Sequence, residues 1–136
     1  MPPDAARAAE TADWLRKARG DLRGAELDLA ADPPLLEDAA FHAQQAVEKT
    51  LKAFLVLHER PFRKTHDLGE IGQLCTAVDP SLERLCRRAD ALTVYAWAFR
   101  YPSEEVAPLL EEVGEAYALA REVVDAVMAR MPTDPG

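Results

Sequence analysis

The chain has 136 residues and a formal net charge of −8, from 24 acidic and 16 basic side chains. Its 49% hydrophobic and 29% charged residues are typical of a globular protein and argue against intrinsic disorder. The acidic balance excludes a broadly basic surface that attracts nucleic acid, so we do not expect a DNA-binding protein. The length predicts a single domain over residues 1–136, with an ordered core over about residues 9–131.

Several classes of protein are excluded by what the sequence lacks. No run approaches ~18 consecutive apolar residues, so we expect neither a transmembrane helix nor a membrane partner. The N-terminus lacks the basic and apolar regions of a secretory signal, and Cys75 and Cys86 have no metal-ligand spacing. These features predict reduced, structural thiols and a cytoplasmic location. The glycines are scattered and form no phosphate-binding loop, so the sequence indicates no cofactor.

Prolines divide the chain into five stretches rich in good helix formers, and no stretch alternates like a β-strand. The predicted helices span about residues 9–29, 36–59, 67–78, 79–99 and 102–127. Thr65 or Asp67 is placed to cap the third helix and Ser103 the fifth, where Pro108 predicts a kink or a late start. Short connections favour an all-α, antiparallel up-and-down helical bundle, with a four-helix-bundle core and a short extra helix.

The charge is unevenly distributed along the chain. Residues 41–66 carry five basic and two acidic side chains, together with the histidines His42, His58 and His66. The acidic charge lies mostly at the two ends of the chain, with a net charge of −4 over residues 1–40, −1 over residues 67–102 and −6 over residues 103–136. One interpretation is a solvated helix face and loop. The other is a local anion site within an acidic protein.

The second predicted helix carries polar residues on two sides. His42, Gln45 and Lys49 fall within a sector of about 60°, nearly opposite the apolar stripe that begins at Ala43. We therefore expect these three side chains to point away from the protein's own core, where they face either solvent or another group. Gln44 lies at the edge of the apolar stripe, where one interpretation is a buried amide with satisfied hydrogen bonds.

Four short blocks of the sequence, in order along the chain, resemble those of a known family. The blocks are Trp14-Leu15-x-Lys17-Ala18-x3-Leu22, Phe41-His42-Ala43-Gln44-Gln45-Ala46-Val47-Glu48-Lys49-x-Leu51-Lys52-Ala53, Thr65-His66-Asp67-Leu68 and Arg100-Tyr101-Pro102. Over about residues 12–130 the chain resembles the HEPN domain (higher eukaryotes and prokaryotes nucleotide-binding). The resemblance implies an up-and-down helical bundle, nucleotide binding and a homodimer. It also implies pairing with a small nucleotidyltransferase in toxin–antitoxin-like modules.

The resemblance also raises the question of ribonuclease activity. Many HEPN members are metal-independent ribonucleases with an Arg, four to six residues and then a His, and their site is assembled across the dimer. A neutral His can take the 2′-hydroxyl proton, and an Arg can stabilise the charge that develops on phosphorus. Arg60 and His66 have this spacing, although Pro61 follows Arg60 and the pair falls in a predicted loop. The alternative makes His66 a capping or packing residue and Arg60 a solvated charge.

Arg100-Tyr101-Pro102 has two interpretations. It could simply end the fourth helix, with Pro102 turning the chain and Arg100 at the negative end of the helix dipole. Arg100 could instead bind a phosphate through two hydrogen bonds, with Tyr101 stacking on a base. Trp97 and Phe99, just before this motif, are expected to form core or dimer contacts.

Two functions of different classes follow. The first is a nucleotide- or RNA-engaging partner of a small nucleotidyltransferase. Its candidate residues are catalytic Arg60 and His66, and ligand-binding His42, Gln45, Lys49, Arg100 and Tyr101. The second is a non-enzymatic dimeric interaction module without nuclease activity. No metal site is expected, because His42 and His58 are separated by about 24 Å of helix rise.

Overall fold

Helices make up all the regular secondary structure in residues 4–99, 102 and 107–132, which the computed structural model describes. None of the helices in this part of the chain is long and apolar enough to cross a membrane. The elements are α1 (Ala5–Ala30), α2 (Leu36–Leu57), α3 (Leu68–Val78), η1 (Pro80–Leu82), α4 (Glu83–Ala89), η2 (Asp90–Ala96) and α5 (Leu110–Met128), where η marks a 3-10 helix. The predicted all-α helical bundle is confirmed.

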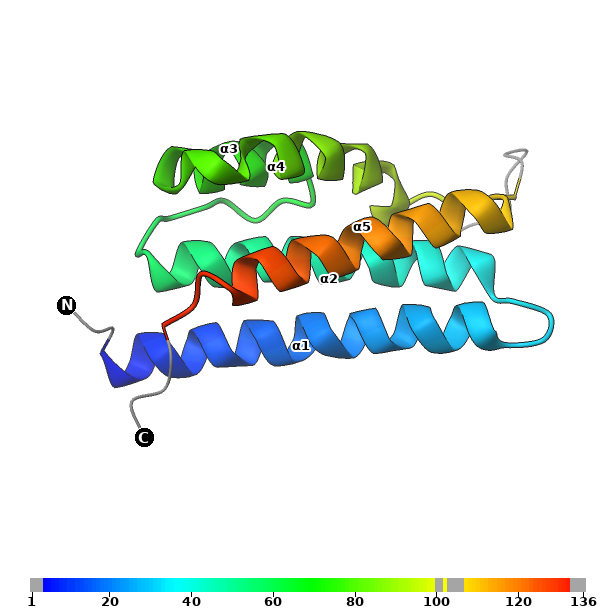
Figure 1. Cartoon of the computed structure of the whole chain (residues 1–136), viewed down its shortest axis with the longest axis horizontal. Coiled ribbons are helices and arrows are strands. Elements are labelled where there is room, and N and C mark those ends of the chain that lie inside the picture. Colours follow the sequence, from blue (N-terminus) through cyan, green and yellow to red (C-terminus); the bar gives the residue numbers. More distant parts are fainter. Residues whose placement is uncertain (1–3, 100–101, 103–106, 133–136) are drawn as a thin grey trace.

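The helix α2 lies at the centre of the molecule. α1, α2 and α5 run along the long axis, and α3 and α4 form a shorter layer on the far side of α2 from α1 (Figure 1). Thirteen of the 22 residues of α2 are buried. Because α2 is covered on several sides, its polar residues face neighbouring elements as well as solvent.

Small residues allow the three long helices to approach one another. Ala18 and Ala25 of α1 are fully buried, as are five alanines of α2. The larger apolar side chains of the core come from α2, α3, η1 and α5. The largest of them are Leu51, Phe54, Leu55, Leu68, Ile71, Leu82, Val47, Val113, Val123 and Val127. The core therefore follows the apolar stripes of the predicted helices.

Side-chain caps mark the starts of α1 and α3. The α1 helix begins before the predicted residue 9, because the Asp4 carboxylate accepts a hydrogen bond from the Arg7 N–H at 2.8 Å. At α3, Asp67 is the cap and accepts hydrogen bonds from the N–H groups of Gly69 and Glu70. Thr65, the other candidate cap, accepts a hydrogen bond from the Asp67 N–H instead.

The prediction of one continuous fourth helix is wrong. The chain forms η1, α4 and η2 in succession, so the regular α-helix covers only Glu83–Ala89. The Thr93 hydroxyl accepts a hydrogen bond from the Leu68 N–H at 3.0 Å and donates one to Asp90 at 3.3 Å. These bonds tie η2 to the start of α3, and such side-chain bonds compete with regular helix geometry.

The fifth helix starts later than its first predicted residue. α5 begins at Leu110, two residues after Pro108. Proline lacks the N–H that a helix interior requires, so of the two predicted effects of Pro108 the late start is the observed one. The predicted cap Ser103 lies outside the described residues.

Candidate functional site

A ridge of polar residues on α2 faces the loop that leads into α3. Gln44, Glu48 and Lys52 are spaced by four residues and therefore lie along one side of the helix. Glu48 Oε1 accepts a hydrogen bond from Gln44 Nε2 at 3.1 Å, and Glu48 Oε2 accepts one from Lys52 Nζ at 3.0 Å. All three side chains are buried. Such a row of polar groups inside a bundle needs partners to offset the loss of water.

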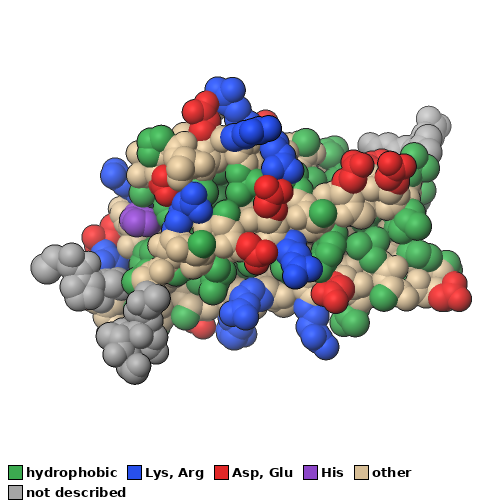
Figure 2. Space-filling model, in the orientation of Figure 1, with side chains coloured by type: hydrophobic (Ala, Val, Ile, Leu, Met, Phe, Trp, Pro, Cys, Tyr) green, Lys and Arg blue, Asp and Glu red, His purple; other side chains and the backbone are tan. Residues whose placement is uncertain are grey.

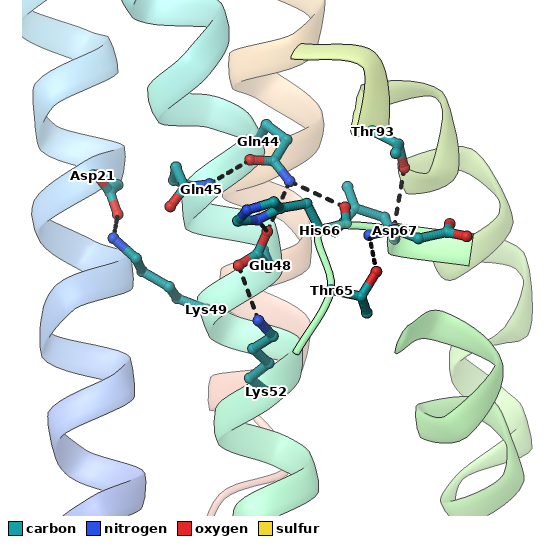
Figure 3. Close-up of polar contacts among 11 residues, drawn as sticks. Asp21, Gln44, Gln45, Glu48, Lys49, Lys52, Thr65, His66, Asp67 and Thr93 are labelled. Atoms are coloured by element: carbon teal, nitrogen blue, oxygen red, sulfur yellow. Dashed lines mark hydrogen bonds and ion pairs between the residues drawn. The ribbon is translucent and has the colours of Figure 1, made fainter. Parts of the chain in front are cut away.

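His66 supplies one of these partners (Figure 3). Its Nδ1 lies 2.7 Å from Glu48 Oε1, and its backbone carbonyl accepts a hydrogen bond from Gln44 Nε2 at 3.4 Å. The Glu48 side chain is 5% exposed, whereas that of His66 is 59% exposed. His66 is therefore anchored on one side by a buried carboxylate and open to solvent on the other.

The charge state of Glu48 determines how His66 is held. Burial raises the pKa of Glu48, but hydrogen bonds from His66, Gln44 and Lys52 outweigh it and bring that pKa below its ordinary value. The carboxylate is thus ionised at neutral pH and only accepts hydrogen bonds. A carboxylate that only accepts hydrogen bonds favours the tautomer in which Nδ1 of His66 donates to it, which leaves Nε2 facing solvent. This is the arrangement of a histidine base that a carboxylate orients.

Aromatic rings surround the charged end of Lys52. Its Nζ lies 5.7 Å from the ring centroids of both Trp14 and Phe62. These two rings pack edge to face, with their centroids 6.5 Å apart. Since Phe62 belongs to the same loop as His66, this contact and the Asp67 cap hold the loop on both sides of the histidine.

A second polar cluster joins α2 to α1. Asp21 Oδ1 lies 3.0 Å from His42 Nδ1, and Asp21 Oδ2 lies 2.6 Å from Lys49 Nζ. His42 Nε2 is 3.9 Å from Asp28 Oδ2. Burial raises the pKa of Asp28, and His42 opposes that rise. His42 and Lys49 lie outside the apolar core, as expected, and they face α1, which covers that side of α2 and supplies Asp21.

Gln45 lies between the two clusters. Its Nε2 donates a hydrogen bond to Gln44 Oε1 at 2.7 Å. Gln44 is fully buried and also bonds to Glu48 and His66, so the interpretation of a satisfied buried amide is confirmed. The amide of Gln45 therefore extends the network of Glu48 and His66 by one residue.

The structure separates Arg60 from the His66 site. Arg60 lines a hollow together with Arg7, Glu59 and Phe62, and its N–H donates a hydrogen bond to the Leu55 carbonyl at 2.9 Å. Within the described part of the chain, no hydrogen bond or ion pair joins Arg60 to His66. Arg100 and Tyr101 lie outside the described residues.

Charges on the surface are mixed in sign. On the face that Figure 2 shows, basic side chains alternate with acidic ones over α1, α4 and α5. Several exposed arginines pair with nearby acids, such as Arg87 with Glu83 and Arg88 with Glu122. This face lacks the continuous basic track that a long nucleic acid needs.

The sequence interpretation missed Glu48, Lys52 and Asp21. The four-residue spacing of Gln44, Glu48 and Lys52 was a usable signal, because three polar residues on one ridge of a largely apolar helix require a polar neighbour. Asp21 carried no such signal, because its partners lie on another helix. The spacing within α1 alone does not reveal them.

The chain is therefore a helical bundle with a largely buried central helix, α2. The polar ridge of α2 holds the loop residue His66 through the Glu48 carboxylate. The HEPN domain model matches residues 11–130, so the chain belongs to the HEPN family. The crystal structure of TT1696 from Thermus thermophilus is similar, with a TM-score of 0.71 and 27% sequence identity. The match covers 89% of this chain and 98% of TT1696. No curated protein matched the chain.

Proposed function

We propose that this HEPN-domain protein engages RNA or a nucleotide at His66, as the homodimeric partner of a small nucleotidyltransferase in a toxin–antitoxin-like module. The observation that carries this function is the 2.7 Å contact between His66 Nδ1 and the buried Glu48 carboxylate, with the imidazole open to solvent. A histidine held in this way can accept a proton at Nε2. Family membership supports the choice of ligand and partner.

With RNA as the ligand, the chemistry is a transesterification. His66 Nε2 takes the proton of a 2′-hydroxyl, and the resulting oxygen attacks the adjacent phosphorus. The bond from phosphorus to the 5′-oxygen breaks, and that oxygen leaves with a proton from water. Glu48 stabilises the imidazolium that forms, because its carboxylate already accepts the Nδ1 proton. No metal ion takes part in this scheme.

The phosphate charge requires a cation near His66. His42 and Lys49 are already paired with Asp21, so little of their charge is available. We assign the phosphate contact to the exposed Lys64, two residues before His66, and to Arg100. Tyr101 then contacts the base. Since HEPN sites are assembled across a dimer, these groups can come from either protomer.

One observation favours the second candidate, a non-enzymatic interaction module. Apolar side chains are exposed near the start of α2 and on either side of the undescribed residues 103–106. Leu35 lines a hollow with Ala107 and Pro108, and Leu109 and Trp97 are also exposed. A contiguous exposed apolar patch, such as the one that Leu35 and Ala107 form at this hollow, is a candidate contact with another protein. Both candidates use such a surface, and only the first uses His66.

RNA cleavage in EDTA separates the two candidates. The assay compares the wild type with His66→Ala and Glu48→Gln, and uses His42→Ala as the matched control because His42 also pairs with a carboxylate. We expect His66→Ala to lose at least about 100-fold in rate, as for the loss of a general base, and His42→Ala to retain cleavage. Cleavage by His66→Ala at the wild-type rate would contradict the assignment. Absence of cleavage by the wild type favours the interaction module.

A further inference from the structure

A hollow lies where the first turns of α1 meet the end of α2. Its volume is about 620 Å³, within the range of about 300–1,000 Å³ for small-molecule sites. Apolar walls and a few charged groups line it, as is typical of such sites. Its apolar residues are Ala6, Leu55, Val56, Pro61 and Phe62, and its charged residues are Arg7, Glu10, Glu59 and Arg60.

Arg7 is held at this hollow in spite of an unsatisfied hydrogen-bond donor. Its side chain is only 18% exposed, and its Nε is buried without a hydrogen-bond partner. A terminal nitrogen of its guanidinium forms an ion pair with Glu59. A buried donor without an acceptor lowers stability. Stability alone therefore does not explain why an arginine lies here.

Glu59, the partner of Arg7, directly follows the last turn of α2. Its φ of 54° is the left-handed conformation that commonly ends a helix, and the Arg60 N–H donates to the Leu55 carbonyl as in such helix ends. Its side chain is 70% exposed, so water and solutes reach the ion pair with Arg7. A carboxylate in this position can be displaced by another anion.

Arg60 adds a second guanidinium at the same place. Its side chain is exposed and has no acidic partner among the described residues. Both arginines also act on the nearby His58. Burial lowers the pKa of His58, and the positive charges of Arg60 and Arg7 lower it further, whereas Asp79 raises it. Two guanidinium groups therefore lie beside the apolar wall formed by Phe62 and Leu55, and the carboxylates of Glu59 and Glu10 balance their charge when no ligand is bound.

We propose that this hollow binds a small molecule in which a phosphate monoester or carboxylate is joined to a flat apolar body. The anion displaces Glu59 from Arg7 and is held between Arg7 and Arg60, because guanidinium groups bind such anions in a two-pronged manner. The apolar body packs on Phe62 and Leu55. This site goes beyond the proposed function, because neither RNA nor His66 takes part in it.

Calorimetric titration with phenyl phosphate, benzoate and inorganic phosphate tests the site. We expect saturable binding of phenyl phosphate or benzoate, and whichever binds more tightly identifies the anion. Inorganic phosphate should bind at least tenfold more weakly than phenyl phosphate, about 1.4 kcal/mol, because it lacks the apolar body. Trp14 fluorescence gives a second readout, since its ring packs on Phe62.

Substitutions at the exposed residues Glu59 and Arg60 test the site without disturbing the buried core. Arg60→Gln should weaken binding at least tenfold, and Glu59→Gln should strengthen it by removing the competing carboxylate. Arg84→Gln, on the exposed side of α4, is the matched control and should bind like the wild type. Unchanged affinity in Arg60→Gln, or no saturable binding up to about 10 mM of either aromatic ligand, would overturn the site. Because the assay contains no RNA, its failure leaves the role of His66 untouched, and loss of RNA cleavage leaves this site untouched.

Discussion

Two clusters on α2 are built from the same three kinds of side chain but differ in how open they are. In each, one carboxylate lies between a histidine Nδ1 and a lysine Nζ: Asp21 with His42 and Lys49, and Glu48 with His66 and Lys52. In the first cluster, the second ring nitrogen of His42 faces another carboxylate, that of Asp28, at 3.9 Å. In the second, His66 Nε2 has no hydrogen-bond partner among the described residues.

The difference teaches that composition alone does not identify a reactive histidine. The His42 side chain is 34% exposed and has acids on both sides of its ring, so it links α1 to α2. The His66 ring is anchored through one nitrogen and presents the other to solvent. A ring that uses both nitrogens within the fold stabilises structure, whereas a ring that uses only one can also act on a ligand.

The largest expected effect is on stability, and it distinguishes the two carboxylates. Glu48→Ala leaves Lys52 buried without a counter-ion, so we expect the free energy of unfolding to fall by about 3–5 kcal/mol. Asp21→Ala should cost less, about 1 kcal/mol, because Lys49 and His42 can reach water. Urea unfolding followed by circular dichroism measures both changes.

A double variant serves as the control for this comparison. Glu48→Ala combined with Lys52→Met removes both buried charges, so it should be more stable than Glu48→Ala alone. Equal losses for Glu48→Ala and Asp21→Ala would contradict the distinction between a buried cluster and a partly open one.

The pH dependence of stability is a smaller effect of the same carboxylate. The pKa of Glu48 is lower in the folded protein than in the unfolded chain, so its ionised form favours folding. This contribution is fully present above the unfolded value of about 4.3 and is lost as the pH falls through the folded value. Thermal melts between about pH 7 and pH 3 should therefore show a steeper acid loss in the wild type than in Glu48→Gln. Parallel curves would argue against an ionised Glu48.

Much of the fold was predictable because it depends on local patterns. Apolar residues at spacings of three and four predicted α2, and prolines marked its ends. The fourth helix was predicted incorrectly because Thr93 bonds to Leu68, which is 25 residues away in sequence. A hydrogen bond between residues so far apart in sequence produces no periodic pattern in the amino-acid sequence.

The candidate site was predictable only in part. The resemblance to HEPN blocks drew attention to the segments that hold Gln44 and His66, and the structure joins these two residues by a hydrogen bond. The sequence predicted that His42 and Lys49 lie outside the apolar core but not that α1 faces them, because a helical projection shows which residues share a side and not what covers that side. The packing of α1 over them decides their role.

The smallest expected effect concerns two glycines of α1. A Cβ at Gly20 meets no atom within 4 Å, so Gly20→Ala should raise stability by about 1 kcal/mol through helix propensity. A Cβ at Gly24 comes within 3.3 Å of the His42 ring, so Gly24→Ala should gain less, because the ring has to shift. Thermal unfolding of the two variants measures the difference. Equal gains would show that the His42 ring is not held against α1.

The tautomer of His66 tests the central claim most directly. Long-range proton–nitrogen NMR spectra at neutral pH distinguish a ring protonated at Nδ1 from one protonated at Nε2, and His66→Ala assigns the signal. With Glu48 ionised and accepting from Nδ1, we predict that the wild type is protonated at Nδ1 and that Glu48→Gln weakens this preference. A neutral His66 protonated at Nε2 in the wild type would contradict its role as a base oriented by Glu48.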